Sequence, residues 1–301
     1  MAWNQGVCAV RTMDAERGEA PLVGAHVSIA GGVWKAFARA QAIGANCFQV
    51  FLKSNVQWRI PDLADEDVER FYAERKRTGI TEVVAHACYL VNPASPDRAT
   101  RQKSVRDLSA ELAHAERYGI KWLVLHPGNH LGSGVKRAVT RVAQVLGQAL
   151  EAARNCGILL ETTSGAGTAV GANFEEIAEI IAPAGGDRIG VCIDTAHVFA
   201  AGYDIASEEG FGVMKRRLAE MGLLRRIKVV HVNDSRAPFG SRVDRHAHIG
   251  KGHIGRDGFA RIMRDEDLSP APKILETPKG RCGRRDCDEV NIALLVRLAG
   301  V

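Results

Sequence analysis

The sequence predicts an α/β protein with a single (β/α)8 barrel. Short β-branched runs alternate with longer amphipathic runs along most of the chain, and eight such pairs follow one another. The chain has 301 residues, a suitable length for one barrel of this kind. Eight parallel strands that are each followed by a helix close naturally into a barrel. An open doubly wound sheet alternates in the same way and is the alternative.

Each predicted strand is a short apolar run, and each predicted helix is a longer run with apolar residues at helical spacing. The strands are 22–27, 47–51, 82–86, 122–126, 158–161, 189–193, 227–232 and 273–276. The helices are 32–43, 64–78, 97–118, 136–155, 174–181, 207–221, 256–264 and 287–298. Several helices are followed at once by a glycine that can end them, namely Gly44, Gly79, Gly119 and Gly157.

A glycine turn helps to separate the barrel from the open sheet. An open sheet that binds a dinucleotide has a glycine-rich turn after an early strand. The nearest such turn here, 165–167, comes late and precedes no clear helix start. The sequence therefore favours the barrel.

Composition excludes several classes of protein. Apolar residues make up 46% of the chain and charged residues 25%, which is typical of a globular protein. No apolar run approaches the ~18 residues that a membrane-spanning helix needs. Asp14, Glu16 and Glu19 argue against a secretory signal. We expect residues 1–21 to form a disordered extension and residues 22–301 to form the barrel domain.

Cysteine content and net charge are less specific. The seven cysteines are an odd number in a long chain, which does not suit a small secreted disulfide scaffold and favours a reducing cytoplasm. The net charge of +5 is compatible with an anionic partner but does not require one.

Imidazole and carboxylate side chains gather where the predicted strands end. The C-terminal strand ends form the active-site rim of such barrels. Six consecutive strands, the third to the eighth, end in or lead into residues of this kind: His86, His126, Glu161, Asp194, His197, His231, Asp244, His246 and Glu276. Burying so many of these groups together is costly without a cation.

The residue types indicate which metal and which chemistry to expect. Histidine, aspartate and glutamate without cysteine suit zinc, and manganese or iron are possible. Nine ligands are too many for one ion and indicate two or three. Clustered metals favour the hydrolysis of phosphate esters. The spacings agree, because Asp194 and His197 leave one strand together, and Asp244 and His246 share one face of an extended segment.

The chain resembles endonuclease IV, the zinc-dependent family of apurinic/apyrimidinic (AP) endonucleases also called AP endonuclease family 2. The similarity runs from residue 23 to about residue 277. The stretches that carry it are GAHVSIAGG (24–32), HACYLVN (86–92), LHPGNH (125–130), ETTSGAG (161–167), CIDTAHVFAAGYD (192–204), HVNDSRAPFGSRVDRHAHIGKGHIG (231–255) and ILET (274–277).

The resemblance implies a TIM barrel that holds three zinc ions. The first would be held by His86, His126 and Glu161. The second would be held by the bridging Glu161 with Asp194, His231 and Glu276. The third would be held by His197, Asp244 and His246.

The resemblance also implies an activity. The family hydrolyses the phosphodiester 5′ to an abasic site in duplex DNA, leaves a 3′-hydroxyl and a 5′-deoxyribose phosphate, and trims blocked 3′ ends. We expect Glu161 and Glu276 to act in catalysis, Glu161 by orienting the attacking water. We expect no organic cofactor, no membrane association, a monomer, and a cytoplasmic protein that joins the nucleoid when it acts.

Family members push side chains into the gap left by the lost base, and Tyr89 and Leu90 match those positions. Loop 51–59 matches a DNA-contacting loop, but Val56 stands where well-known members have arginine. One inserted contact is therefore missing, and Lys53, Gln57 or Arg59 of the same loop could compensate for it. The further DNA-binding residues that we expect are Lys53, Gln57, Arg59, His26 and Arg245.

Other features depart from the family or are open to two interpretations. Ala87 stands where aspartate is frequent, which predicts that His86 lacks a hydrogen-bond partner. Cys282 and Cys287 could hold a further metal, although a second ligand pair is absent. The basic segment 279–285 either holds DNA phosphates at the rim or is a solvated loop.

Two other functions stay open at this level. Sugar isomerases and epimerases of the xylose isomerase type share the barrel and bind one or two metals, but have no counterpart to Asp244 and His246. A catalytically weak protein that binds abasic DNA is the second alternative, which Val56 and Ala87 keep open. Metal content and a cleavage assay separate the three.

Overall fold

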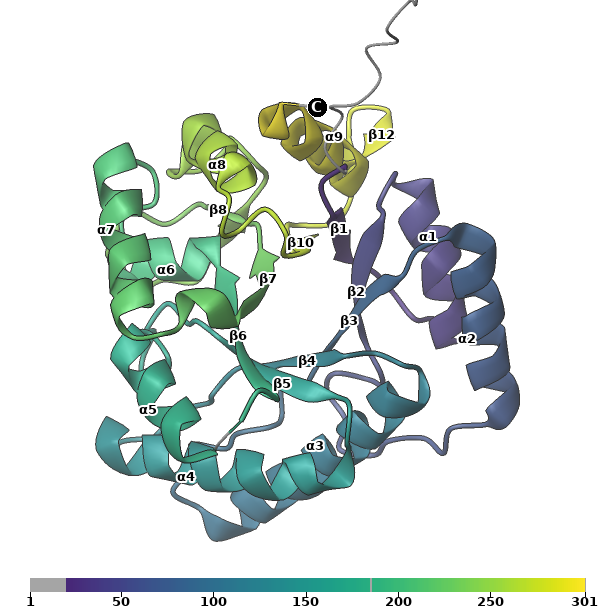
Figure 1. Cartoon of the computed structure of the whole chain (residues 1–301), viewed down its shortest axis with the longest axis vertical. Helices are drawn as coiled ribbons and strands as arrows, with labels where there is room; N and C mark the ends of the chain where they lie inside the picture. Colours follow the sequence, from purple (N-terminus) through teal and green to yellow (C-terminus); the bar gives the residue numbers. More distant parts are fainter. Residues whose placement is uncertain (1–19, 185, 301) are drawn as a thin grey trace, which may run out of the picture.

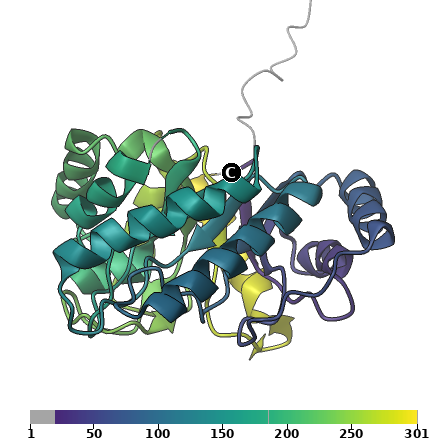
Figure 2. The same ribbon diagram turned by 90° about the horizontal axis from the view of Figure 1, so that it is seen from below.

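A computed structural model describes residues 20–184 and 186–300 as a closed barrel of eight parallel strands surrounded by helices (Figure 1). The strand order around the barrel is β1-β10-β7-β6-β5-β4-β3-β2. This arrangement confirms the predicted (β/α)8 fold and excludes the open sheet. Figure 2 shows α3 and α4, in blue-green, lying across the outside of the strands.

The barrel strands agree closely with the predicted runs. They are β1 (Val23–His26), β2 (Cys47–Phe51), β3 (Glu82–His86), β4 (Trp122–Leu125), β5 (Gly157–Glu161), β6 (Ile189–Asp194), β7 (Ile227–His231) and β10 (Lys273–Leu275). The principal helices are α1 (Ala36–Ala42), α2 (Asp65–Thr78), α3 (Arg98–Arg117), α4 (Val135–Ala149), α5 (Phe174–Ala184), α6 (Thr195–Ala201), α7 (Glu208–Glu220), α8 (Gly255–Arg264) and α9 (Cys287–Ala299).

Short elements complete the described part of the chain. The 3-10 turns are Val33–Lys35, Leu150–Ala152 and Leu224–Arg226. Two small antiparallel hairpins pair β8 (Asp234–Ser235) with β9 (His246–Ala247) and β11 (Arg281–Cys282) with β12 (Arg285–Asp286).

The interior of the barrel is filled by one small cluster of side chains. Seven strands each contribute one buried residue to it: Cys47, Val84, Val124, Leu159, Cys192, Val229 and Ile274. β1 contributes Gly24, which pairs with Cys47 and Ile274 on its two neighbours. A Cβ atom at Gly24 would lie 1.8 Å from the Cys47 carbonyl oxygen, so only glycine fits between these strands. This packed layer forms the floor beneath the strand ends that carry the polar residues.

Three features differ from the sequence predictions. α6 follows β6 directly, where the sequence predicted only a turn. The hairpins β8–β9 and β11–β12 were not predicted, because two-residue strands leave no periodic pattern. The predicted extension 1–21 lies outside the described residues except for Ala20 and Pro21. Within the described ranges, no helix is long and apolar enough to span a membrane.

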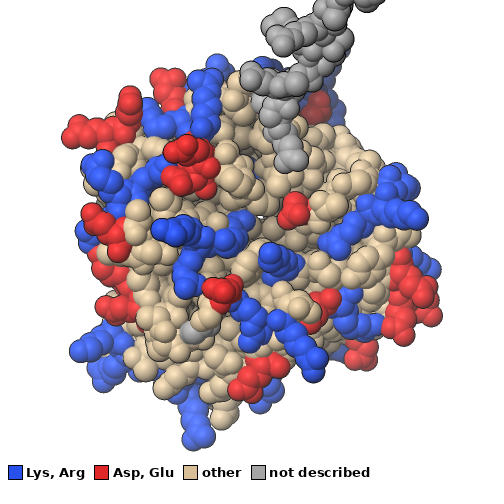
Figure 3. All heavy atoms as spheres, viewed as in Figure 1, with Lys and Arg blue, Asp and Glu red and all other residues tan. Residues whose placement is uncertain are grey.

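The face seen in Figure 3 carries many lysine and arginine side chains near its middle. A cavity of about 820 Å³ lies where β4 to β7 begin. Its lining includes the basic residues Lys121, Arg188, Arg225, Arg226 and Lys228. The polar residues discussed below lie at the opposite ends of the same strands.

Candidate metal centre

The structure brings all nine strand-end histidines and carboxylates together on one rim. Their ligand atoms form three overlapping groups, in each of which these atoms lie within 4.8 Å of one another. The groups are His86, His126 and Glu161; Glu161, Asp194, His231 and Glu276; and Asp194, His197 and His246. The first two coincide with the expected ligand sets.

The third group differs in one member. It contains Asp194 instead of the expected Asp244. Asp244 is nevertheless adjacent, because its Oδ2 lies 3.2 Å from His197 Nε2 and its Oδ1 lies 3.3 Å from His246 Nε2. Asp244 is half exposed, whereas Asp194 is fully buried, so Asp244 closes this group from the solvent side.

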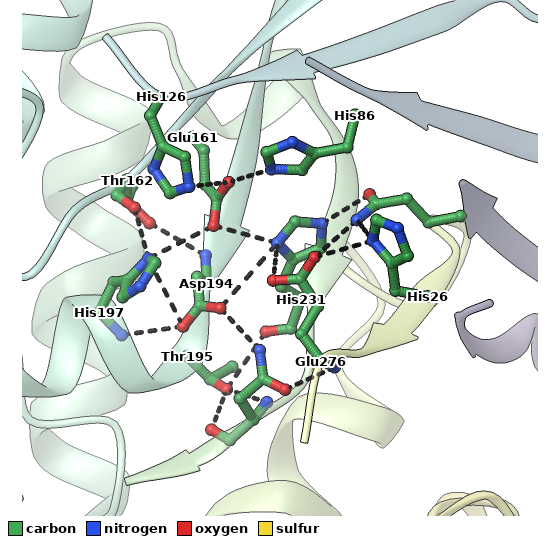
Figure 4. A network of polar contacts seen from close by, with 12 residues as sticks. His26, His86, His126, Glu161, Thr162, Asp194, Thr195, His197, His231 and Glu276 are labelled. Atoms are coloured by element: carbon green, nitrogen blue, oxygen red, sulfur yellow. Dashed lines mark hydrogen bonds and ion pairs between the residues drawn. The ribbon is translucent and has the colours of Figure 1, made fainter. Parts of the chain in front are cut away.

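Glu161 at the end of β5 lies at the centre of the cluster (Figure 4). Its Oε2 lies 3.2 Å from His86 Nε2 and 3.4 Å from His126 Nε2. Its Oε1 lies 3.1 Å from His231 Nδ1 and 3.4 Å from His197 Nδ1. One fully buried carboxylate therefore faces two groups of imidazoles with its two oxygens, as a bridging ligand must.

Backbone carbonyls orient three of the histidines. Nδ1 of His86 donates to Ala87 O at 2.8 Å, Nδ1 of His197 donates to Thr162 O at 2.8 Å, and Nδ1 of His246 donates to Glu276 O at 3.2 Å. The proton on Nδ1 leaves Nε2 as the nitrogen with a free lone pair, which is the usual arrangement of a metal-binding histidine. The prediction that His86 lacks a partner is wrong, because the carbonyl of Ala87 supplies one.

His231 is held in the opposite way. Its Nε2 donates to Gln49 Oε1 at 2.8 Å, so Nδ1 faces the carboxylates. The amide nitrogen of Gln49 donates to Glu276 Oε1 at 2.7 Å and lies 3.0 Å from His26 Nδ1. Gln49 thus orients one histidine and one carboxylate of the cluster.

Asp194 and Asn233 connect the cluster to the backbone. Asp194 caps the first turn of α6, because its Oδ1 accepts from His197 N at 2.9 Å. Its Oδ2 accepts from Asn233 Nδ2 at 2.7 Å, and Asn233 Oδ1 accepts from Glu276 N at 2.8 Å. The cap explains why His197, three residues after β6, returns to the same cavity as Asp194.

The charges of the cluster stabilise one another. Burial opposes ionisation of Glu161, but His126 and His231 outweigh it and hold its pKa well below the usual range. Burial likewise opposes protonation of His197, but Asp194 and Asp244 outweigh it and raise the pKa of this imidazole. His126 is different, since burial is the dominant influence and lowers its pKa.

The donor set fits divalent metal ions. His246 Nε2 is buried and has no hydrogen-bond partner in the part of the chain that the structure describes, although Asp194 and Asp244 oxygens lie 3.6 and 3.3 Å away. Free imidazole nitrogens that converge with carboxylate oxygens, without thiols, suit zinc, manganese or iron.

Several expected DNA contacts lie at or beside this rim. The Tyr89 side chain is 59% exposed, and its ring lies 5.9 Å from the His86 ring and 6.4 Å from the His126 ring between centroids. Leu90 is half-buried, and His26 is mostly buried beside Glu276. Gln57, Arg59 and Arg245 are exposed, as a side chain that contacts DNA must be.

Lys53 is not placed to contact DNA. Its Nζ is buried, pairs with Asp107 Oδ1, and lies 3.9 Å from Glu111 Oε1. It also donates to Gln57 O at 2.9 Å. The expectation of a direct DNA contact is therefore wrong, because the Lys53 ammonium faces α3 and the backbone of its own loop.

Cys282 and Cys287 form a disulfide and so do not hold a metal ion in this structure. Among the described residues, Cys47, Cys88, Cys156 and Cys192 have free, buried thiols. The spacing alone could not distinguish a metal site from a disulfide.

Comparison with known proteins gives a consistent result. A family described as a xylose isomerase-like TIM barrel matches residues 37–293. A probable endonuclease 4 from Chloroflexus aurantiacus is 43% identical over 279 residues, which is 91% of this chain and 97% of the relative.

Solved structures extend the comparison to the fold. Endonuclease IV from Thermus thermophilus has a TM-score of 0.81 and 39% identity, and the match covers 92% of this chain and 98% of that one. A D-tagatose 3-epimerase-like protein has a TM-score of 0.68 at 18% identity, a likeness that shows the shared barrel alone.

Proposed function

This chain belongs to the endonuclease IV family, and we propose that it is a DNA-repair nuclease that hydrolyses the phosphodiester 5′ to abasic sites in duplex DNA. The products would be a 3′-hydroxyl and a 5′-deoxyribose phosphate, and the enzyme would also trim blocked 3′ ends. The observation that carries the proposal is the set of three overlapping ligand groups beside the exposed Tyr89. A sugar isomerase needs fewer ligands than these.

We propose that the centre holds three zinc ions, one at each ligand group, with manganese or iron as possible substitutes. Glu161 would bridge the first two ions, and His197, His246 and Asp244 would hold the third. When bound, the metals supply Lewis acidity, which activates water and neutralises charge on the phosphoryl oxygens.

The two proposed catalytic carboxylates have different surroundings. Glu161 is fully buried, and imidazole nitrogens lie within 3.4 Å of both its oxygens, so we propose that it positions the histidines and orients the attacking water. Glu276 is 16% exposed, and its Oε1 is held by Gln49. Its Oε2 lies 3.4 Å from His231 Nδ1, so both oxygens of Glu276 contact the ligand cluster.

Damage recognition would depend on the rim. Inserting a side chain into duplex DNA costs unstacking energy, which is least where a base is already missing. Tyr89 and Leu90 are proposed to fill that gap. His26, Gln57, Arg59 and Arg245 are the remaining proposed contacts, while the exposed Val56 at the tip of the loop supplies no cation.

The remaining proposals follow from the substrate. The barrel, residues 22–301, would be the catalytic domain and would act as a monomer without an organic cofactor. Because its substrate is DNA, the protein would act in the cytoplasm at the nucleoid.

The test is cleavage of a duplex that carries one stable abasic analogue, beside an undamaged duplex. We expect a single cut 5′ to the lesion that leaves a 3′-hydroxyl and disappears with a strong chelator. If protein shown to contain about three metal ions per chain cut neither duplex, the proposal would be wrong and a sugar-converting barrel would be favoured.

Glu161→Gln tests the role of the bridging carboxylate. We expect loss of metal and a fall in cleavage of at least about 100-fold, because the neutral amide does not bridge two ions. Glu69→Gln is the matched control, since Glu69 is exposed on α2. Full activity with full metal content in Glu161→Gln would contradict the assigned role.

A further inference from the structure

The Cys282–Cys287 disulfide lies close to the candidate metal centre in the chain and in space. It joins Cys282 in β11, which is six residues after Glu276, to Cys287, the first residue of α9. Asn291 links the two regions, because its Nδ2 donates to Thr277 Oγ1 and lies near His248 Nδ1, both at 3.1 Å. A disulfide in a protein that acts on DNA in a reducing compartment is usually transient, so its chemistry matters.

The two sulfurs differ in access and surroundings. Cys282 is partly exposed, whereas Cys287 is 4% exposed. Cys287 begins the 13-residue helix α9, and a thiolate at a helix N-terminus is stabilised by the helix dipole. Of the acidic groups in this turn, Asp286 is occupied as the helix cap, Asp288 pairs with Lys279 Nζ at 2.6 Å, and Glu289 Oε1 lies 3.8 Å from Arg285 Nη1. An incoming thiolate therefore reaches Cys282, and Cys287 is the better leaving group.

His248 lies beside Cys282, where an N–H group would stabilise the thiolate that Cys282 becomes when it is released from a mixed disulfide. The backbone N–H of Ile249 donates to Asn291 Oδ1 at 3.2 Å, which fixes the direction of that amide. Asn291 Nδ2 must then donate to His248 Nδ1, so the proton of the neutral ring is on Nε2. His248 Nε2 lies 4.0 Å from Cys282 Sγ. With the proton on Nε2, an N–H group faces the Cys282 sulfur. The same proton leaves Nε2 without the lone pair that a metal ion would need.

We propose that Cys282–Cys287 is a thiol–disulfide exchange site that controls DNA binding by the adjacent basic hairpin. The part of this inference that concerns DNA binding rests on the proposed function. In the first step the thiolate of a small thiol such as glutathione attacks Cys282 Sγ, and Cys287 leaves as a thiolate. A second glutathione thiolate then attacks the glutathione sulfur of the mixed disulfide. The products are glutathione disulfide and two cysteine thiols, which together have taken up two electrons and two protons.

The hairpin gives the exchange a consequence. Segment 279–285 carries Lys279, Arg281, Arg284 and Arg285, all exposed, on the rim that follows Glu276. The oxidised hairpin is also held by its strand pairing and by the hydrogen bond from Cys287 N to Gly280 O. Opening the disulfide nevertheless lets the Cys282 end of the hairpin move. The reduced hairpin then has more conformations to lose when it binds DNA phosphates, which makes binding weaker. We expect the reduced protein to bind abasic duplex about three- to tenfold more weakly.

The first experiment reads the thiols without DNA. The full-length, metal-loaded protein is equilibrated in glutathione buffers of varied ratio, alkylated, and examined by mass spectrometry. We expect reversible opening of this pair while Cys47 and Cys192, buried in the barrel, stay unmodified in the folded protein. In Cys287→Ser, Cys282 should form a mixed disulfide with glutathione, whereas Cys287 should react much more slowly in Cys282→Ser. Equal reaction at both positions would overturn the assigned roles.

His248→Gln should slow the exchange several-fold, and His253→Gln is the matched control because His253 is exposed on the same long loop. The second experiment measures the affinity of oxidised and reduced protein for an abasic duplex by fluorescence anisotropy. The double variant Cys282→Ser, Cys287→Ser should bind like the reduced form in every buffer.

The outcomes separate the two proposals. Binding of abasic DNA without any exchange would overturn the thiol site alone. Exchange with equal DNA affinity in both states would overturn the proposed control. Exchange without any binding of abasic DNA would overturn the proposed function together with the control.

Discussion

Gln49 connects two members of the candidate metal centre through one side-chain amide. Its oxygen accepts from His231 Nε2 at 2.8 Å, and its nitrogen donates to Glu276 Oε1 at 2.7 Å. The side chain is fully buried in β2, so no water competes for these bonds. Removing the amide would let His231 present either nitrogen to the cavity and would free Glu276 to rotate.

We therefore expect Gln49→Leu to weaken metal binding by about 10- to 100-fold, the usual effect of removing a group that orients metal ligands. The measurement is competition for zinc with a chromophoric chelator. Gln102→Leu, on the exposed side of α3, should leave metal affinity unchanged. Unchanged affinity in Gln49→Leu would show that the histidine and carboxylate are oriented by the rest of the network.

Some residues of the candidate site could be recognised from the sequence, and others could not. Most of the metal-ligand types could be recognised because they end or closely follow a barrel strand, whereas Asp244 and His246 lie in the long connection after β7. Gln49 and Asn233 could not, since an amide in or after a strand also suits ordinary hydrogen bonding. Lys53 was misassigned, because a lysine in a loop that matches a DNA-contacting loop is indistinguishable in sequence from one that turns inward.

At the scale of elements, the loop after β2 is tied to α3 by a buried ionic cluster. Lys53 Nζ pairs with Asp107 and approaches Glu111, both on α3, and donates to the carbonyl of Gln57. Among the described residues, Asp107 Oδ2 and both oxygens of Glu111 find no hydrogen-bond partner. The cluster therefore holds the loop that carries Gln57 and Arg59 against the barrel at a high cost in desolvation.

Lys53→Met keeps the length of the side chain and removes its charge. We expect the free energy of unfolding to fall by about 3–5 kcal/mol, since one partner of a buried ion pair is lost. The loop should also become more susceptible to proteolysis. Denaturant unfolding and limited proteolysis measure the two effects, with Lys76→Met on the exposed face of α2 as control. A loss equal to that of the control would mean that the ion pair does not anchor the loop.

Glu111 makes stability depend on pH. Burial, with a smaller contribution from Asp107, raises its pKa to about 8 despite the nearby Lys53. In the unfolded chain the same group titrates near ~4.3. Between these values the folded state binds more protons, so the free energy of unfolding falls as pH rises.

Glu111→Gln has no such proton to lose. Relative to the wild type, the variant should therefore gain stability between pH 5 and pH 8, by an amount on the order of a few kcal/mol. Thermal unfolding across this range measures the difference, and Glu69→Gln should show none. A constant difference between wild type and Glu111→Gln would contradict the raised pKa.

Elements were predicted from sequence when they were long enough to show a period. The eight barrel strands and their helices were found within a few residues of their bounds. α6 was missed because it has only seven residues, and all but one of them are buried against the metal-ligand cluster and the core. It therefore has no polar face that would mark it as a helix in the sequence. The disulfide between β11 and α9 depends on how the hairpin folds back, which spacing does not encode.

At the scale of the whole molecule, two groups of basic residues lie at opposite ends of the barrel. One surrounds the cavity where β4 to β7 begin, and includes Lys121 and Arg225. The other is the hairpin after β10, which includes Arg284 and Arg285 at the end that carries the candidate metal centre. The net charge of +5 belongs to the whole chain and does not identify the region that contacts DNA.

Two double variants with equal charge separate these regions. Arg284→Glu with Arg285→Glu, and Lys121→Glu with Arg225→Glu, each replace two positive by two negative charges, so each changes the net charge from +5 to +1. Long-range attraction to DNA falls equally in both. Only the hairpin variant loses direct phosphate contacts, and each lost contact reduces the slope of log K against log salt by about 0.9.

We therefore expect the hairpin variant to lose up to about two units of that slope and the cavity variant to keep it. Binding of metal-loaded protein to an abasic duplex across a range of salt concentrations measures both. A wild-type slope in both variants would mean that neither basic region contacts phosphates and that the charges act only at long range. A loss confined to the cavity variant would place DNA at the wrong end of the barrel, where the strands begin. The metal ligands lie where the strands end, so that result would contradict the proposed site itself.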